Sequence, residues 1–191
     1  MTLSKIMDTT EGIHKPLGKY IFNNVQFGKH DPIIEKMRDA NYRVFNHPTD
    51  DTGVLVTFPV KWEGVPFARV NGKEVNLDTA IDQLEKYKLI QTSWTQQNTS
   101  VTISYSLDEV GDIIQWLLKN WDIYVGVSFI YRADPSKTAQ DLGYLYLPQE
   151  VVDKATYNKY VAELKEVDLN NTNTFEELTD MDCATGACPI K

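Results

Sequence analysis

The chain has 191 residues, of which 42% are hydrophobic and 24% are charged, and its formal net charge is −8. This length and apolar content suffice for a domain with its own core, and they exclude a chain that is disordered throughout. The acidic charge excludes direct nucleic-acid binding, because that role requires clustered Lys and Arg, and no apolar run approaches the roughly 20 residues of a membrane span.

A short helix between two strands is the first structure that the sequence predicts. Asp31-Pro32 is typical of a helix start, because Asp caps the helix and Pro fits its first turn, and the helix is expected to end near Ala40. A short strand should follow at residues 42–45. The β-branched and aromatic run at residues 54–58 predicts a second strand, which Pro59 is expected to end.

The middle of the chain alternates between helical and strand patterns. Asp78 is expected to cap a helix, after which apolar residues recur at helical spacing. These residues are Ile81, Leu84, Tyr87, Ile90 and Trp94. Alternation at residues 101–105 then predicts a strand. Ser106 and Glu109 form a capping-box pattern ahead of a second helix, which should end near Asn120.

The run at residues 124–130 is largely apolar, which is typical of a strand buried on both faces of a sheet. Helix, strand, helix and strand at this spacing predict an α/β architecture, which could be part of a barrel. We expect Trp94, Trp116 and Trp121 to lie in the core, because they occupy helical or helix-ending positions. His14 is expected to form a structural hydrogen bond.

The patterns weaken in the last third of the chain. A short extended piece is expected at residues 144–148, and a last helix at about residues 149–164. Residues 165–182 are polar and acidic and include too few apolar side chains to be buried. We therefore expect a partial α/β domain in residues 1–164 and a flexible acidic tail in residues 165–191.

Both cysteines of the chain lie in this tail, at Cys183 and Cys188, with four residues between them. A short turn that contains Gly can bring two such Cα atoms within the roughly 4.4–6.8 Å that a disulfide needs. Exposed thiols at this spacing can close and open a disulfide repeatedly. We therefore expect a redox-active dithiol.

Three other interpretations of the cysteine pair can be weighed against this one. A zinc site requires about four ligands, but the imidazoles of His14, His30 and His47 lie far upstream, so no metal site is expected. A structural disulfide requires an oxidising compartment, yet the N-terminus lacks the apolar core of a signal peptide, and a cytoplasmic location is expected instead. Two incidental surface thiols are the third interpretation.

The ending Asp-Cys-Ala-Thr-Gly-Ala-Cys-Pro-Ile-Lys at residues 182–191 resembles the C-terminal tail of ribonucleotide reductase large chains. The resemblance extends along the chain, because residues 97–103, the helix that follows them and residues 121–129 look like the last helix–strand units of that family's ten-stranded α/β barrel. It is strongest to the monomeric, adenosylcobalamin-dependent class II enzymes, which reduce ribonucleoside triphosphates. The resemblance implies a C-terminal segment of that barrel, followed by the redox tail.

One strand favours this class over the iron-dependent class. In iron-dependent enzymes the strand carries two adjacent tyrosines that relay a radical, whereas residues 125–129 here read Val-Gly-Val-Ser-Phe. A cobalamin enzyme forms its radical beside the active site and needs no such relay. The resemblance therefore implies adenosylcobalamin as the cofactor of the complete enzyme.

The resemblance also implies roles for residues at both ends of the chain. In the family, the Cys-x4-Cys pair carries reducing equivalents into the active site, so Cys183 and Cys188 would re-reduce the active-site disulfide and would be reduced by thioredoxin in turn. The family's phosphate-binding loop ends in a Gly-Thr-Leu-Ser type of sequence, and Thr2-Leu3-Ser4 follow Met1 directly. Thr2 and Ser4 would therefore contact substrate phosphates.

Other functional groups of the family lie on earlier strands of the barrel. These groups are the radical-forming cysteine, the reducible cysteine pair and the catalytic glutamate, and this chain has no cysteine before Cys183. We therefore expect the chain to begin inside the phosphate-binding loop and to be inactive without an N-terminal part of the reductase.

The expected function is that of a C-terminal fragment or split subunit of a ribonucleoside-triphosphate reductase. Its partners would be the N-terminal part of the enzyme, thioredoxin and a ribonucleoside triphosphate. A degraded remnant of the enzyme is a second explanation. The alternative from another class is an autonomous dithiol carrier or interaction domain that works without cobalamin.

Overall fold

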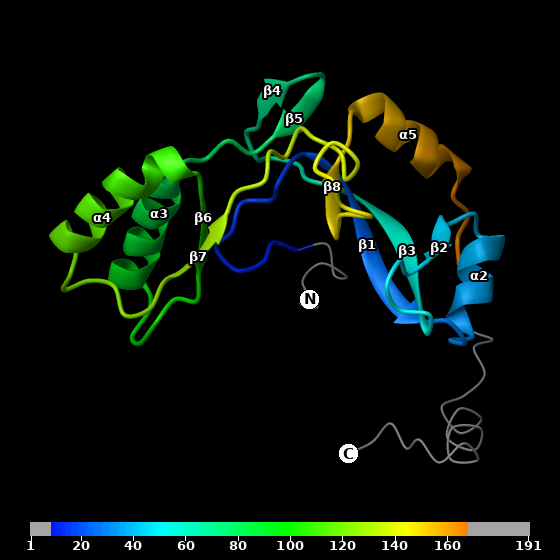
Figure 1. Ribbon diagram of the computed structural model, residues 1–191, viewed down its shortest axis with the longest axis horizontal. Helices are drawn as coiled ribbons and strands as arrows, with labels where there is room; N and C mark the ends of the chain where they lie inside the picture. Colours follow the sequence, from blue (N-terminus) through cyan, green and yellow to red (C-terminus); the bar gives the residue numbers. More distant parts are fainter. Residues whose placement is uncertain (1–8, 168–191) are drawn as a thin grey trace, which may run out of the picture. The chain divides into compact units, whose positions relative to one another are not determined.

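The computed structural model describes residues 9–167, which divide into two compact units (Figure 1). Unit 1 comprises residues 9–23 and 59–157, and unit 2 comprises residues 24–58 and 158–167. The strands are β1 (Tyr20–Gly28), β2 (Val44–Asn46), β3 (Gly53–Lys61), β4 (Ala68–Val70), β5 (Lys73–Val75), β6 (Thr102–Tyr105), β7 (Ser128–Tyr131) and β8 (Gln149–Val151). The helices are α2 (Ile33–Asp39), α3 (Ala80–Ser93), α4 (Val110–Lys119) and α5 (Lys154–Glu163), with a 3₁₀ turn, η1 (Leu107–Glu109), before α4. The predicted α/β class is confirmed.

The largest core of unit 1 lies where α3 and α4 pack beside β6 and β7 (Figure 1). β6 and β7 are parallel, and α4 forms the crossover between them, as parallel strands require. The buried side chains of this core come from α3, α4 and the β6 region. They are Ala80, Leu84, Tyr87, Val101, Ile103, Ile113 and Trp116.

A second part of unit 1 is built on the antiparallel pairing of β1 with β8. Ile21 lies opposite Val151, and Asn23 lies opposite Gln149. Ile21 and Val151 join Val75 in a small buried cluster, against which Trp62 packs. In the sheet that contains these strands the order is β2-β3-β1-β8.

A tight hairpin connects β4 and β5 in the same unit. Asn71 and Gly72 at its tip both have positive φ, at 49° and 79°, which is the backbone geometry of a type I′ turn. The Asn-Gly pair adopts this geometry with little strain, because Gly lacks a Cβ atom and Asn tolerates the left-handed region.

Unit 2 packs α2 against β2 and the adjoining half of β3. Ile34, Val54 and Val56 form its buried cluster. The buried Thr57 hydroxyl donates a hydrogen bond of 2.7 Å to Asn24 Oδ1, while the Tyr160 hydroxyl donates one of 2.8 Å to the Thr57 carbonyl. Each of these polar side chains therefore has a structural partner inside the unit.

Two sequence predictions about strands are wrong. β3 does not end at Pro59 but continues to Lys61. β2 pairs with β3 only as far as Val56, so the missing N–H of Pro59 removes no bond to that neighbour. β7 begins at Ser128, later than predicted, and its residues are exposed rather than buried on both faces, because the described sheet gives it a partner on one side only.

The predicted helix caps and the predicted burial of the tryptophans are confirmed only in part. Thr79, not Asp78, caps α3, and its side chain exchanges hydrogen bonds with Asp82 in a capping box. The capping box of Ser106 and Glu109 and the end of α4 before Asn120 are confirmed. Trp116 is buried as predicted, but the exposed fractions of the other two tryptophans are high, at 87% for Trp94 and 69% for Trp121.

No helix in residues 9–167 has the length and apolar character that crossing a membrane requires.

Candidate functional site

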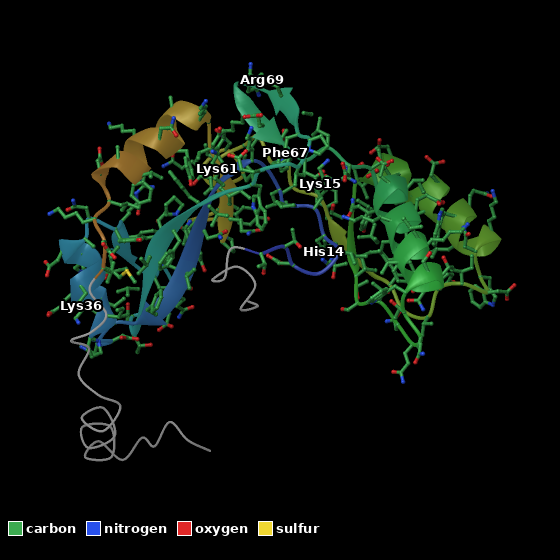
Figure 2. The ribbon with its side chains drawn as sticks, turned by 180° about the vertical axis from the view of Figure 1, so that it is seen from behind. His14, Lys15, Lys36, Lys61, Phe67 and Arg69 are labelled. Atoms are coloured by element: carbon green, nitrogen blue, oxygen red, sulfur yellow. The ribbon has the colours of Figure 1, made fainter. Side chains whose placement is uncertain are left out.

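A pocket of about 410 Å³ lies within unit 1. One wall is the segment before β1, which includes His14 and Lys15 (Figure 2). The sheet residues Asn23 and Gln149 form a second wall, and Lys86 of α3 lies on a third. The volume falls in the range of roughly 300–1,000 Å³ that is typical of pockets for small molecules.

His14 ties the segment before β1 to β6. Its Nδ1 lies 2.6 Å from the Glu11 carbonyl oxygen, and its Nε2 accepts a hydrogen bond of 3.1 Å from the Thr102 N–H. A neutral imidazole with its proton on Nδ1 satisfies both bonds. Burial lowers the pKa of His14 below its usual range, and the charge of Lys86 acts in the same direction. His14 therefore has the structural hydrogen-bonding role that the sequence predicts.

Lys15 forms an ion pair with a carboxylate that also lines the pocket. Its Nζ lies 2.6 Å from Asp78 Oδ1 and 5.7 Å from the ring centroid of Phe67 (Figure 2). Asp78, which the sequence analysis assigned to a helix cap, thus serves as the ion-pair partner of Lys15. The pair joins the segment before β1 to the start of α3.

The Gln83 carboxamide fixes β6 to α3 at the pocket wall. Gln83 Oε1 accepts a hydrogen bond of 3.0 Å from the Ser104 N–H, and Gln83 Nε2 donates one of 3.0 Å to the Ser104 carbonyl. Both ends of this amide are used within the protein. Gln83 therefore shapes the pocket and offers little to a ligand.

The sheet wall of the pocket carries a pair of carboxamides. Asn23 and Gln149 are directly opposite each other in the β1–β8 pairing, and Gln149 Nε2 donates a hydrogen bond of 2.9 Å to Asn23 Oδ1. Asn23 is only 4% exposed, although it lines the pocket. The apolar side chains of Ile21 and Trp62 lie beside this pair in the lining.

A second polar cluster forms around Glu109, outside the pocket lining. Its carboxylate accepts hydrogen bonds from the N–H groups of Ala80 and Ser106, at 2.7 and 2.8 Å, and from Arg132 Nη2 at 2.7 Å. Burial by itself would raise the pKa of Glu109, but these bonds outweigh it and lower the pKa to about 2. The cluster joins the starts of α3 and η1 to the end of β7.

The predicted site residues lie outside this description. Cys183 and Cys188 are not among the described residues 9–167, and neither are Thr2 and Ser4. Within that range, no three His, Cys, Asp or Glu side chains are grouped so that they could hold a metal ion. In sequence order, the first described residue of the pocket lining is Thr9, which follows the predicted phosphate contacts Thr2 and Ser4 by a few residues.

The side chains that form the pocket could not be predicted from the sequence. Asn23, Lys86 and Gln149 match no motif, and they come from elements that are far apart in the chain. The one local signal was the Asn23-Asn24 pair inside an aromatic and β-branched run, because Asn is depleted in strands.

Comparison with known proteins shows relatives along the whole chain. No family model matches the sequence. An adenosylcobalamin-dependent ribonucleoside-triphosphate reductase of Lactobacillus delbrueckii subsp. bulgaricus is 28% identical, over 100% of this chain and 25% of the relative. A probable adenosylcobalamin-dependent ribonucleoside-triphosphate reductase of Dictyostelium discoideum is 26% identical, over 99% of this chain and 24% of its own length.

A solved structure has the same fold. It is a crystal structure of a B12-dependent, class II ribonucleotide reductase, which superposes with a TM-score of 0.70 at 23% identity and covers 94% of this chain and 23% of the other. The chain spans about a quarter of the length of the curated relatives that it matches. Over its whole length, the chain is therefore homologous to a part of the adenosylcobalamin-dependent ribonucleoside-triphosphate reductases.

Proposed function

We propose that the chain is the C-terminal part of a ribonucleoside-triphosphate reductase, as a fragment or as a separate subunit. The complete enzyme would make deoxyribonucleotides by a radical mechanism that depends on adenosylcobalamin. The observation that carries this proposal is the similarity to such enzymes along the whole chain. The α/β fold shared with a class II reductase supports it.

The exposed surface of unit 1 supports the need for a further polypeptide. Among the described strands β7 pairs only with β6, and its Phe129, Ile130 and Tyr131 are 38%, 58% and 62% exposed. On α4, Ile114 and Leu118 are 50% and 66% exposed. Parallel sheets are normally covered on both faces, and large apolar patches mark interfaces. In the proposal, the partner is the part of the reductase that carries the radical cysteine, and this chain is inactive without it.

The described pocket, of about 410 Å³, falls in the size range of pockets for small molecules. Adenosylcobalamin enters this proposal only through the relatives that depend on it. We therefore assign no residue of this chain to the cofactor. Cobalamin binding belongs to the complete enzyme in this proposal.

The proposed task of Cys183 and Cys188 is to return electrons to the active site. A thiolate of the pair attacks the active-site disulfide, forms a mixed disulfide and releases one active-site thiol. The second tail cysteine then attacks the mixed disulfide, which releases the other active-site thiol and leaves a Cys183–Cys188 disulfide. Thioredoxin reduces that disulfide by the same exchange and supplies the two electrons.

Residues near the start of the chain would bind the substrate. In the proposal, Thr2 and Ser4 donate hydroxyl and backbone N–H groups to the phosphates of a ribonucleoside triphosphate. Replacing both by Ala should raise the KM for the triphosphate more than it lowers kcat. An unchanged KM would remove these two residues from the site.

The test of the proposal is a reduction assay with ribonucleoside triphosphate and adenosylcobalamin. It compares this chain alone, a polypeptide that supplies the rest of the reductase, and the two together. Activity is expected only for the mixture. If no combination is active, the proposal fails and the autonomous dithiol carrier becomes the better explanation.

The tail cysteines are tested in the same mixture with two reductants. Cys183→Ser and Cys188→Ser should each abolish turnover with thioredoxin but leave turnover with a small dithiol, which reaches the active site directly. Ala184→Ser is the matched control, because it adds a hydroxyl between the cysteines and removes no thiol. Full activity of the cysteine variants with thioredoxin would contradict the proposed role of the tail.

A further inference from the structure

The pocket wall that precedes β1 is held at two places by different kinds of bonds. Its second part, residues 15–17, is held by the Lys15–Asp78 ion pair and by a 2.7 Å hydrogen bond that the Asn76 N–H donates to the Leu17 carbonyl. Of the side chains, only imidazole ordinarily changes its charge between pH 5 and 8, so this anchor is expected to be insensitive to pH in that range. The first part, residues 9–14, is called the strap here. The pocket-lining side chains that it supplies are Thr9, Thr10, Glu11, Ile13 and His14.

The imidazole of His14, which is labelled in Figure 2, ties the strap to β6. Two N–H groups of β6 bond to side chains and not to a strand. The Thr102 N–H donates to His14 Nε2 at 3.1 Å, and the Ser104 N–H donates to Gln83 Oε1 at 3.0 Å. Among the described strands β6 pairs only with β7, so these side chains take the place of a second neighbour strand. The two acceptors differ in one respect, because an imidazole can be protonated near neutral pH and a carboxamide cannot.

A single proton removes the bond between His14 and β6. In the neutral ring, Nδ1 carries its proton toward the Glu11 carbonyl oxygen, 2.6 Å away, and the lone pair of Nε2 accepts from Thr102. A proton added at Nε2 turns this acceptor into a donor that faces the Thr102 N–H, so two donors repel each other where a hydrogen bond was. The bond between Nδ1 and Glu11 lies inside the strap and does not anchor it to β6.

The charges in the pocket lining disfavour a protonated His14. Burial lowers the pKa of His14, and the like charge of Lys86 on α3 lowers it further. The carboxylate of Asp78 is already paired with Lys15. Glu11, the other carboxylate of the described lining, belongs to the strap and moves with His14. The remaining polar side chains that β6, α3 and the sheet wall contribute to the lining are neutral, namely Thr102, Ser104, Gln83, Asn23 and Gln149.

We propose that His14 is a proton-sensitive latch of the pocket wall. With a neutral imidazole the strap is held against β6, and with a protonated imidazole residues 9–14 leave β6 while residues 15–17 stay in place. Ile13 packs against the α3–α4 core, and its apolar contact is the one that release has to break. Release opens one wall of the pocket and weakens the binding of any ligand that contacts the strap. The inference does not depend on the proposed function, because it concerns the wall and not the molecule that the pocket binds.

Amide hydrogen exchange of the full 191-residue chain, followed by NMR from pH 8 to pH 4.5, tests the latch. The ring signals of His14, identified by their loss in His14→Gln, give its pKa in the same samples. Because the latch closes only when His14 is neutral, the protection of the Thr102 amide should fall about 10-fold for each pH unit below that pKa, after correction for the intrinsic exchange rate. The Ser104 amide is the internal control, since its acceptor Gln83 does not titrate, and its protection should stay constant.

The motion of the strap is measured separately by the ¹⁵N heteronuclear NOE. The NOE values of the Glu11 and Ile13 amides should drop with the same midpoint as the His14 titration, because a released segment moves on the ps–ns timescale. The Leu17 amide should keep a high value, since Asn76 still anchors this residue.

Two variants separate the effect of the proton from the effect of the fold. His14→Gln has no titrating ring, so the pH dependence of Thr102 protection should vanish. His14→Phe removes the acceptor, so Thr102 should exchange rapidly at every pH, while a protected Ser104 reports that the core is folded. His30→Gln, at an exposed position, is the matched control and should reproduce the wild-type profile.

Three outcomes would overturn the latch. The first is Thr102 protection that runs parallel to that of Ser104 at all pH values, which would mean acid unfolding of β6 and not release of the strap. The second is a wild-type pH dependence in His14→Gln. The third is protonation of His14 while the NOE values of Glu11 and Ile13 stay high. None of these measurements requires reductase activity, so the latch and the proposed function can fail independently.

Discussion

Arg132 and Glu109 form an ion pair in which Arg132 Nη2 lies 2.7 Å from Glu109 Oε2. Arg132 directly follows β7, and Glu109 ends the η1 turn that follows β6. The same arginine nitrogen donates a 2.8 Å hydrogen bond to the Ser104 carbonyl. The pair therefore couples the end of β7 to the turn between β6 and α4.

Glu109→Gln should lower the free energy of unfolding by about 2–3 kcal/mol. The amide that replaces one oxygen is a donor, and it faces donors from Ala80, Ser106 and Arg132. Urea denaturation measures the change. Asp108→Asn, at the exposed neighbouring position, is the control and should change stability by less than about 0.5 kcal/mol. Equal effects of the two variants would show that the cluster contributes nothing specific.

The stabilisation by Glu109 should depend on pH. Its pKa is lowered from 4.5 to about 2 in the folded chain, so the ionised carboxylate favours folding. Because Glu109 is partly exposed and solvent screens its interactions, this contribution is about 1–2 kcal/mol; it is complete above the unfolded pKa near 4.5 and is lost as the pH falls through 2. The difference in unfolding free energy between wild type and Glu109→Gln, measured by urea denaturation from pH 7 to pH 2, should shrink in this window. A difference that stays constant to pH 2 would contradict the lowered pKa.

His14 should remain neutral in the folded chain at pH 7. Burial lowers its pKa below the usual 6.5, so protonation favours the unfolded state. Its contribution to stability is present above pH 6.5 and is lost as the pH falls through the folded pKa. An NMR titration of the His14 ring protons measures this pKa directly. His14→Gln should flatten the pH dependence of the unfolding free energy between pH 5 and 7, and a His14 pKa above 6.5 would refute the assignment.

Thr79→Ala should destabilise the chain by about 1 kcal/mol, because it removes the side-chain cap of α3. Thr92 lies in the last turn of the same helix, and its hydroxyl bonds only to carbonyls of the preceding turn. Thr92→Ala is therefore the matched control and should leave the unfolding free energy within about 0.5 kcal/mol of wild type. Thermal and urea unfolding of both variants decide whether Thr79 acts as the cap.

Adjacent isoleucines on α4 should respond differently to truncation. Ile113 is 6% exposed and lies in the α3–α4 core, whereas Ile114 is 50% exposed. Ile113→Ala should cost about 2–4 kcal/mol of unfolding free energy, and Ile114→Ala less than about 1 kcal/mol. The prediction is checked by urea denaturation of the two variants. A larger loss for Ile114→Ala would mean that the opposite face of α4 packs on the sheet.

The start and the end of α4 could be predicted from residues close together in the sequence. The Ser106 and Glu109 pattern marks the helix start because both side chains bond backbone groups nearby in sequence, and the apolar spacing carries the helix to its end. The hairpin of β4 and β5 also has a local signal, since Asn71-Gly72 is a strong indicator of a type I′ turn. Such features depend on residues a few positions apart.

Other elements could not be predicted from local sequence. β1 was missed because Asn23 and Asn24 interrupt its apolar pattern, and the three-residue β8 exists only through its pairing with β1. β7 reads as a buried strand, yet its burial depends on what covers it and not on its own composition. The pocket could not be predicted for the same reason, since no local pattern relates Asn23 to Gln149.

The pairing of β1 with β8 makes the pocket a late product of folding. The hydrogen bond between Gln149 and Asn23 joins residues that are 126 positions apart, and contacts of such high sequence separation form slowly because a long loop must close first. During synthesis, β1 leaves the ribosome before β8 and cannot pair with it until β8 has also left the exit tunnel. In that interval the backbone edge of β1 that pairs with β8 is unpaired, so we expect chaperone binding to the nascent chain to be strongest after β1 has emerged and before β8 has emerged.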